Sequence, residues 1–364
     1  MNRPKYQLIT DWIRKRIEDG ELSAGDRLES EHEISKNFGI SRQTVRHALA
    51  LLVQEGVLAK VQGSGTYVKR KKERDVKSGS LSRTVTIIST YIDGYIFPRI
   101  LKEMVKTLEA AGYGVRIMYT ENRLETEKTL LQRILEEDSR DPLIVEPVMS
   151  GLPNPNLIYY KMLQERGLPI LFFHSEYPEL SIPCVRMDDI KAGKRATEYL
   201  ISQGHTRIAG IFKADDGQGR RRYEGMIRAL REAEIELNDE WICWMDSQDL
   251  REPEGLEFRL AFRLKNCTAC VCYNDEVAHI FTDYCTKHKI RIPEDLSVVS
   301  IDNSELARLN TVPLTSVMHP MEMLGKKTAE NMLHLIKDPD FQAVYYFDPE
   351  IEVRSSVRNI TEIG

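Results

Sequence analysis

The segment that decides the fold of the first domain runs from Glu29 to Val68 and reads ESEHEISKNFGISRQTVRHALALLVQEGVLAKVQGSGTYV. Ser30, followed three residues later by Glu33, has the spacing of a capping box, which predicts the start of a helix. Gly39 is expected to end that helix in the left-handed conformation. A second helix should follow a tight turn, because Ser41 is a good N-cap and apolar residues recur at helical spacing at Val45, Ala48, Leu49 and Leu52.

The polar face of this second helix carries side chains that suit the edges of bases and the phosphates of a major groove. A two-stranded hairpin is predicted next, and the glycines at its tip allow close approach to a DNA backbone. A first helix at Lys5–Asp19 should brace these elements, with Lys5 placed to reach a phosphate. The predicted DNA-contacting residues are Lys5, Arg42, Gln43, Thr44, Arg46, Gln62 and Gly65. The alternative is that the two arginines only form a solvated helix face.

The stretch from Gly25 to Val68 resembles the winged helix-turn-helix of the GntR family of bacterial regulators, because many of its positions match the family pattern in order. The resemblance implies an α+β DNA-binding domain at the N-terminus. One departure is Glu29, where the family usually has proline. The absence of proline is expected to loosen the loop before the second helix without removing the fold.

Composition and charge support a soluble regulator with one DNA-binding end. The chain has 364 residues and a net charge of −5. Residues 1–80 hold 16 Lys and Arg against 11 Asp and Glu, whereas the remainder holds 35 against 45. A basic module on an acidic body favours nucleic-acid binding by that module. The start of the chain has no apolar segment of the kind that a signal peptide requires, and the six cysteines are scattered, so a cytoplasmic, reduced protein is expected.

Three segments are expected: a winged-helix domain at 1–69, a charged linker at 70–83 and a sugar-binding body at 84–364. From Thr84 onward, short apolar runs alternate with helical patterns, which is typical of parallel α/β folds. The number of strands is too large for one sheet, so two lobes are expected. The predicted helices of the body span 98–111, 125–137, 156–167, 189–203, 219–233, 275–288 and 321–337.

Ligands of open parallel sheets bind beyond the carboxyl ends of the strands. The residues that follow the predicted strands are rich in carboxylates, amides and aromatic rings, which bind vicinal hydroxyls and cover the apolar face of a sugar ring. The site therefore suits a small neutral polyol, most simply a sugar. Any single member has a second interpretation as a helix cap or an exposed loop residue. The predicted ligand-binding residues are Tyr95, Phe97, Glu146, His174, Lys213, Asp215, Gln218, Arg222, Tyr273, Asn274, Asp275 and Asp302.

A second resemblance covers nearly all of residues 84–364. It rests on the segments DDIKAGKRATEYLISQGHTRIAGIF, RRRYEGM, VCYNDEVA and IPEDLSVVSIDNSELA, which resemble the sugar-binding body of the LacI/GalR regulators, a relative of periplasmic binding proteins. The resemblance implies that Arg222 and Asp302 contact the ligand, and that Asp275 matches the family's N-D element. Ser300 departs from the family, which has glycine there.

A GntR-type head on a LacI-type body resembles the arabinose-responsive repressor family of Gram-positive bacteria. This pairing implies a homodimer on a palindromic operator, with L-arabinose as the favoured effector that releases the DNA. It also implies that no LacI-type hinge helix contacts the minor groove. The matching stretches are TYIDGYIFP, LIVEP, GIFKADDGQG and CYNDE.

Other functions remain open at this point. A sugar phosphate or another acidic derivative could be held by Lys213, Arg221 and Arg222. A sugar transport protein shares the body but would need a signal peptide and no winged helix. An enzyme would need a catalytic constellation that the sequence does not contain. Cys267 and Cys270 form a CxxC pair, but no second ligand pair accompanies it, so we expect no metal and no cofactor.

Overall fold

The computed structural model describes residues 5–19, 21–23, 25–54, 57–61, 65–68, 81–252 and 254–361. The chain divides into two compact units, Met1–Gly79 and Ser80–Gly364. The boundary between them lies inside the segment 70–83 that the sequence predicts as a linker. Residues 70–80 of that segment lie outside the described part of the chain.

The first unit is a winged helix-turn-helix, as the sequence predicts. It consists of α1 (Lys5–Glu18), α2 (Glu31–Phe38), α3 (Arg42–Gln54), β1 (Leu58–Val61) and β2 (Gly65–Val68). The capping box at Ser30 and Glu33 is formed, and Gly39 ends α2 with φ 61°. The apolar stripes of the three helices meet in one core, which includes Ile9, Ile13, Ile34, Val45, Leu49 and Leu52. This core holds the polar face of α3 outward.

The loop before α2 contains an ion pair at the position where the family has proline. The Glu29 carboxylate accepts a hydrogen bond from Arg16 Nη1 at 2.7 Å. The guanidinium of Arg16 also lies over the ring of Trp12, 4.7 Å from its centroid. An ion pair to α1 therefore supports the position where the family has proline. Although the rigid proline ring is absent, the loop is still connected to α1 through Arg16.

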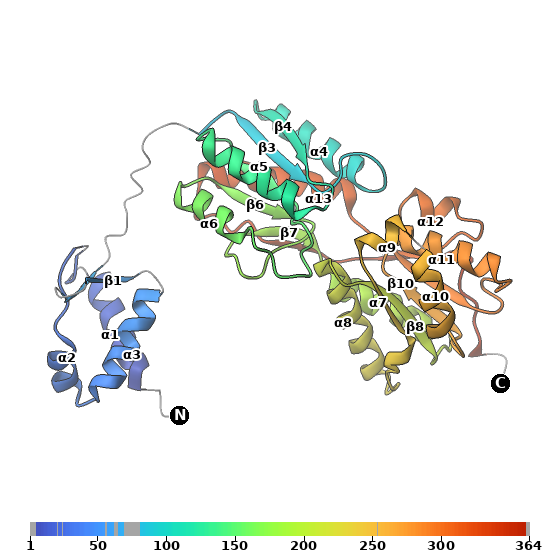
Figure 1. Ribbon diagram of the computed structural model, residues 1–364, viewed down its shortest axis with the longest axis horizontal. Coiled ribbons are helices and arrows are strands. Elements are labelled where there is room, and N and C mark those ends of the chain that lie inside the picture. Colours follow the sequence, from blue (N-terminus) through green and yellow to red (C-terminus); the bar gives the residue numbers. More distant parts are fainter. Residues whose placement is uncertain are drawn as a thin grey trace. The chain divides into compact units, whose positions relative to one another are not determined.

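The described residues of the second unit form two lobes, each on a six-stranded sheet (Figure 1). In the first lobe the strand order is β4-β3-β5-β6-β7-β13, and all pairs are parallel. Its strands are β3 (Thr84–Ser89), β4 (Gly114–Tyr119), β5 (Leu143–Val145), β6 (Ile170–Phe173), β7 (Cys184–Met187) and β13 (Tyr345–Phe347). Its helices are α4 (Phe97–Ala110), α5 (Leu124–Glu136), α6 (Leu157–Glu165) and α13 (Met321–Lys337).

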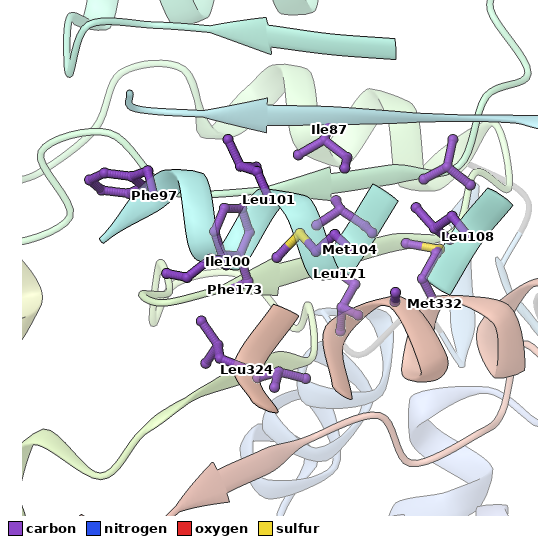
Figure 2. Close-up of a cluster of buried hydrophobic side chains, with 14 of the residues drawn as sticks. Ile87, Phe97, Ile100, Leu101, Met104, Leu108, Leu171, Phe173, Leu324 and Met332 are labelled. Carbon is purple, nitrogen blue, oxygen red and sulfur yellow. The ribbon is translucent and has the colours of Figure 1, made fainter. Parts of the chain in front are cut away.

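Helices cover both faces of this sheet. Figure 2 shows the side chains of α4 and α13 packed together with strand residues on one face. The two helices approach so closely that a Cβ at Gly325 would collide with the carbonyl of Ile100. On the other face, α5 and α6 pack with residues such as Leu131, Tyr160 and Phe172. Both faces are apolar because a parallel sheet is buried on both sides.

The second lobe has the strand order β9-β8-β10-β11-β12-β14, and β14 is antiparallel to β12. Its strands are β8 (Ile208–Lys213), β9 (Ile242–Met245), β10 (Ala269–Cys272), β11 (Ser297–Asp302), β12 (Thr315–Met318) and β14 (Ile351–Glu352). Its helices are α7 (Asp189–Ser202), α8 (Gly217–Glu232), η1 (Asp239–Trp241), α9 (Ser247–Arg251), α10 (Glu254–Arg263), α11 (Asp275–Lys287) and α12 (Glu305–Leu309). Apolar residues of α7 and α8 meet one face of this sheet, and those of α10 and α11 meet the other.

The described chain crosses between the lobes at Asp188, at His319 and Pro320, and at residues 348–350. Consequently α13 and β13 complete the first lobe although they come late in the sequence. Every helix predicted for the body is present, with its ends shifted by at most about two residues. The sequence reasoning missed β7, β9, β12, β13 and β14, which have two to four residues each, and the helices α9, α10 and α12.

Candidate functional site

A cavity of about 330 Å³ lies between the two lobes, where the carboxyl ends of both sets of strands meet. This volume is at the small end of the range for ligand pockets. Most of the residues that the sequence predicts as ligand-binding line it, and they come from both lobes. The predicted residues that line the cavity are Tyr95, Phe97, Glu146, His174, Lys213, Gln218, Arg222, Tyr273, Asn274 and Asp302.

Arg222 is the most completely buried charge in the site, with a side chain that is 1% exposed. It extends from α8, and its guanidinium donates to Asp189 Oδ1 at 3.0 Å, to the carbonyl of Tyr273 at 2.6 Å and to Asp302 Oδ1 at 3.0 Å. Close packing of α7 on α8 permits this geometry, because a Cβ at Gly225 would collide with the carbonyl of Ile190. The glycine three residues after Arg222 therefore serves the packing that holds the arginine.

Asp302 joins the lobes through the side chain of Tyr95. The hydroxyl of Tyr95, from the first lobe, donates to Asp302 Oδ2 at 2.7 Å, and it also accepts from the backbone N–H of Asp275 at 3.2 Å. Burial by itself would raise the pKa of Asp302, but the charge of Arg222 and the hydrogen bond from Tyr95 outweigh it, so the pKa is lowered. Asp302 is thus an ionised acceptor at neutral pH.

Glu146 and His174 form a second polar pair on the first lobe. Glu146 Oε2 accepts from Ser89 Oγ, from the backbone N–H of Thr90 and from Thr90 Oγ1, while Oε1 lies 2.9 Å from His174 Nδ1. Burial would lower the pKa of His174, but the hydrogen bond and the charge of Glu146 outweigh this and raise it. In the described part of the chain, His174 Nε2 and Gln218 Oε1 are buried without a hydrogen-bond partner.

Lys213, Asp216 and Tyr273 form a polar cluster on the second lobe. Lys213 Nζ donates to Asp216 Oδ2 at 2.7 Å, and the Tyr273 hydroxyl donates to the same oxygen at 2.9 Å. Burial would lower the pKa of Lys213, but the charges of Asp216 and Asp215 raise it overall. Lys213 is therefore charged and already paired with a carboxylate.

Two predicted ligand-binding residues do not line the cavity. Asp215 accepts from the backbone N–H of Ser247 at 2.9 Å and so fixes the start of α9. Asp275 lies behind the cavity and accepts from Ser300 Oγ, from Ser316 Oγ and from the backbone N–H of Ser304. The serine that replaces the family's glycine at position 300 is thus a partner of Asp275. Burial and the charge of Asp302 raise the pKa of Asp275 to about 6.

The structure adds residues to the cavity wall that the sequence reasoning did not select. They are Thr90, Tyr91, Asp93, Gly94, Ile96, Asn122, Pro147, Asp216, Ser247, Leu250, Arg251 and Glu276. Tyr91 and Asp216 follow strands, so the same rule of strand ends could have selected them. Ser247 and Arg251 follow β9, a short strand that the sequence pattern does not reveal. Asn122 lies in the loop that follows β4, and no sequence signal distinguishes it from its neighbours.

Four residues of the cavity wall have a left-handed backbone conformation. Tyr95, Asn122, His174 and Asp302 all line the cavity and all have positive φ, at 50°, 53°, 65° and 106° respectively. This region of φ is costly for residues that have a Cβ, and it persists where the surroundings fix the conformation.

The predicted DNA-contacting residues of α3 lie on its outer face. Arg42, Gln43 and Arg46 are exposed, and Thr44 is half-buried next to Ser41. Arg46 is engaged, because its guanidinium donates to Glu31 Oε2 from Nε at 3.2 Å and from Nη2 at 3.0 Å. On the wing, Gly65 has φ 130°, and a Cβ there would lie 2.9 Å from Arg27 Nε. Gln62 and the side chain of Lys5 lie outside the described residues.

Two general features complete the description. No helix in the described residues has both the length and the apolar character needed to cross a membrane. Cys270 and Cys272 are buried in β10 as free thiols, and Cys267 is partly buried beside it. Burial raises the pKa of the Cys267 thiol to about 12, so it is protonated at neutral pH.

Comparison with known proteins agrees with this architecture. Residues 5–68 match the family "Bacterial regulatory proteins, gntR family", and residues 197–357 match the "Periplasmic binding protein-like domain". The transcription regulator CcpA of Lactococcus lactis, a solved structure, matches with a TM-score of 0.68 and 24% identity, over 76% of this chain and 100% of that chain. At this identity the likeness shows the fold alone.

Two curated relatives match over nearly the full length. An arabinose metabolism transcriptional repressor of Geobacillus stearothermophilus is 35% identical over 363 residues, which cover 98% of each chain. The protein of the same name from Halalkalibacterium halodurans is 35% identical over 361 residues, covering 97% of this chain and 96% of that protein. The chain shares with these relatives both a full-length similarity and the combination of a gntR-type domain with a periplasmic-binding-protein-like domain. It therefore belongs to the family of the arabinose metabolism transcriptional repressors.

Proposed function

We propose that this protein represses arabinose utilisation genes in the cytoplasm, as a homodimer bound to a palindromic operator, and that L-arabinose releases it from the DNA. The proposal rests on its family, on the outward face of α3 and on the cavity between the lobes. Two-fold symmetry in the protein and in the operator would place the half-sites about 34 Å apart, or a multiple of that distance.

The observation that carries the sugar assignment is a pair of buried polar atoms at the cavity. His174 Nε2 and Gln218 Oε1 have no partner among the described residues, although each belongs to a residue that lines the cavity. A buried polar atom without a partner costs about 1–3 kcal/mol. Hydroxyl groups can donate and accept, so a polyol whose hydroxyl reached either atom would satisfy it. Tyr91, Tyr95 and Phe97 supply aromatic surface for the apolar face of a sugar ring.

The charges around the cavity favour a neutral sugar over a sugar phosphate. An acidic ligand would need free cations, but Lys213, Arg221 and Arg222 each have a carboxylate partner. Arg251, the remaining cation of the wall, donates to the backbone carbonyl of Glu121 at 3.4 Å. Lys213 pairs with Asp216, Arg222 pairs with Asp189 and Asp302, and Arg221 pairs with Glu176 at 2.6 Å. The wall also contains more carboxylates (Asp93, Glu146, Asp216, Glu276, Asp302) than ammonium and guanidinium groups (Lys213, Arg222, Arg251). An added phosphate would meet net negative charge.

We assign no enzymatic activity, because the relatives are repressors and the polar groups of the site are engaged in holding the cavity rather than arranged around a nucleophile. On the DNA side, Arg42, Gln43 and Arg46 would read or anchor in the major groove, with Thr44 beside them. Gly65 and Gln62 of the wing would contact the adjacent backbone. The Arg46–Glu31 pair would then exchange for a contact to DNA.

Repression and release require coupling between the two sites. Sugar that closes the lobes must favour a dimer geometry in which the two heads no longer fit the operator. A coupling free energy of about 1–3 kcal/mol would shift operator affinity by roughly 5- to 150-fold. Because coupling is reciprocal, operator must weaken sugar binding by the same factor.

The test is calorimetric titration of the full chain with pentoses, hexoses and their phosphates, followed by operator binding with and without the sugar that binds. Saturable heat with L-arabinose and loss of operator affinity in its presence would support the proposal. Heat with a sugar phosphate alone would overturn the choice of effector. Binding of L-arabinose that leaves operator affinity unchanged would overturn the mechanism of release.

A further inference from the structure

The lobes also touch each other in a region beside the cavity, and Asp216 belongs both to this region and to the cavity wall. On the first lobe this region comprises the loop 149–151, which follows β5, and Glu176, which follows β6. On the second lobe it comprises residues 214–217 and the side chains of Arg220 and Arg221 at the start of α8. We call this contact the seam. Ser150, Gly151, Glu176, Arg220 and Arg221 are absent from the cavity wall.

The seam is held by hydrogen bonds from one lobe to the other. The N–H of Gly151 donates to the carbonyl of Asp215 at 2.9 Å, and Arg220 Nη1 donates to the carbonyl of Gly151 at 2.6 Å. Ser150 Oγ accepts from the N–H of Gly217 at 3.0 Å. Arg221 Nη2 donates to Glu176 Oε1 at 2.6 Å. Both backbone groups of Gly151 are therefore bonded to the opposite lobe.

Gly151 leaves no room for a side chain. A Cβ there would lie 2.5 Å from the carbonyl oxygen of Ala214 and 2.9 Å from the carbonyl carbon of Asp215. These atoms belong to the backbone of the other lobe and cannot move aside as a flexible side chain can. The φ angle of Gly151 lies outside the positive region that only glycine adopts readily, so alanine is compatible with the local backbone. The obstacle to a larger residue is therefore the contact between the lobes.

The loop moves with the first lobe because a buried carboxylate anchors it. Glu127 Oε2 accepts from Asn154 Nδ2 at 2.9 Å and from Asn156 Nδ2 at 2.8 Å, and Glu127 Oε1 accepts from the Tyr177 hydroxyl at 2.7 Å. The same hydroxyl accepts from the N–H of Val148 at 2.7 Å. Since the loop is fixed to its own lobe, the seam exists only while the two lobes are close together.

We propose that the seam sets the affinity of this protein for its sugar by controlling how readily the lobes close, with Gly151 and Arg220 as positioning residues that do not touch the ligand. The inference rests on the proposed function. If sugar binds the closed form, the apparent dissociation constant equals the intrinsic constant divided by the closed fraction. A change that opposes closure then weakens every sugar by one factor and leaves selectivity unchanged.

Gly151→Ala in the full chain is the test, with Gly255→Ala as the matched control because a Cβ at Gly255 meets nothing within 4 Å. By calorimetry, Gly151→Ala should bind L-arabinose at least about tenfold more weakly than the wild type, because the lobes must separate to admit the Cβ. Any other sugar that the wild type binds should weaken by the same factor. Operator affinity without sugar should be unchanged or higher.

Thermal melting separates this role from a merely structural one. The melting temperature of Gly151→Ala without sugar should equal that of the wild type, while the increase caused by a saturating sugar should shrink. Arg220→Ala should also weaken sugar binding, by about threefold. Arg228→Ala, which changes an exposed side chain on the same helix, should leave sugar affinity unchanged.

Outcomes of these experiments are distinguishable. If the wild type binds no sugar, the proposed function fails. If the wild type binds L-arabinose and Gly151→Ala binds it equally well, the seam has no role and this inference is overturned. A loss of affinity that differs from sugar to sugar would also overturn it, because that result would assign Gly151 to the ligand contact itself.

Discussion

The hydroxyl of Tyr95 in the first lobe lies 2.7 Å from Asp302 Oδ2 in the second lobe, and the same carboxylate is held from its own lobe by Arg222 at 3.0 Å. One buried side chain therefore receives a donor from each side of the cavity. The relationship joins residues 207 positions apart in the chain. It makes the wall of the cavity depend on how the lobes are placed.

Removing the Tyr95 hydroxyl should weaken sugar binding. In Tyr95→Phe, Asp302 loses one of its donors, and a hydrogen bond to a charged group contributes about 1.5–3 kcal/mol. We expect L-arabinose affinity to fall by about tenfold or more by calorimetry. Operator affinity without sugar should be unchanged, since the winged helix is a separate unit. Tyr119→Phe, on an exposed side chain, is the control, and equal affinity of Tyr95→Phe and the wild type would contradict the prediction.

Arg222→Met should destabilise the body. The substitution leaves Asp189 and Asp302 buried without their cation, and breaking a buried pair by removing one partner costs about 3–5 kcal/mol. Chemical denaturation followed by the fluorescence of Trp241 and Trp244, both in the second lobe, reports this loss. Arg228→Met removes an exposed pair with Glu224 and should change stability little. Similar stabilities of the two variants would show that the buried network contributes nothing.

Arg46→Ala should weaken operator binding and leave sugar binding unchanged. The guanidinium lies on the outer face of α3, so we expect operator affinity to fall by about ten- to a hundredfold while L-arabinose affinity in solution stays the same. If Arg46 contacts a phosphate, the slope of log affinity against log salt should also fall by about 1. Equal loss of both affinities would contradict the separation of the two sites.

Glu31→Gln should have the opposite effect on DNA binding. Glu31 holds the Arg46 guanidinium at 3.0 Å and raises the pKa of Arg46 through that hydrogen bond. Its neutral replacement weakens the partner that competes with DNA for the Arg46 guanidinium. Operator affinity, measured by fluorescence anisotropy, should therefore rise, and the rise should disappear in the double variant with Arg46→Ala. A persistent rise there would assign the effect to charge alone.

The pH dependence of stability should report Asp275. Burial and the neighbouring Asp302 raise the pKa of Asp275 to about 6 from an ordinary value of 3.8. A raised pKa in the folded chain gives a stabilising contribution that is fully present below the ordinary value and is lost as pH rises through about 6. The wild type should therefore lose about 2 kcal/mol relative to Asp275→Asn between pH 4 and pH 7, and almost nothing further above that. Asp283→Asn, on the exposed side of the same helix, should show no such trend.

Local sequence signals determined the first unit almost completely. The capping box at Ser30, the left-handed Gly39 and the apolar stripe of α3 depend on residues close together in the chain, so their meaning is independent of distant parts. Seven helices of the body were predictable for the same reason, because each shows its buried face within a short window, whereas α9, α10 and α12 were missed. The strand-end rule then selected most of the cavity wall, since polar residues follow buried strands directly.

Tertiary structure decided what those residues do. Asp275 and Asp302 both follow strands, yet one lies behind the cavity with serines and the other faces it, and the sequence pattern of the two is the same. Ser247 and Arg251 reach the cavity from α9, a helix that the sequence did not predict, and the partners of Arg221 and Arg222 come from distant segments. Sequence periodicity records which side of an element is buried. It does not record which distant atom lies opposite, and that pairing fixes the charge, the strain and the closure of this site.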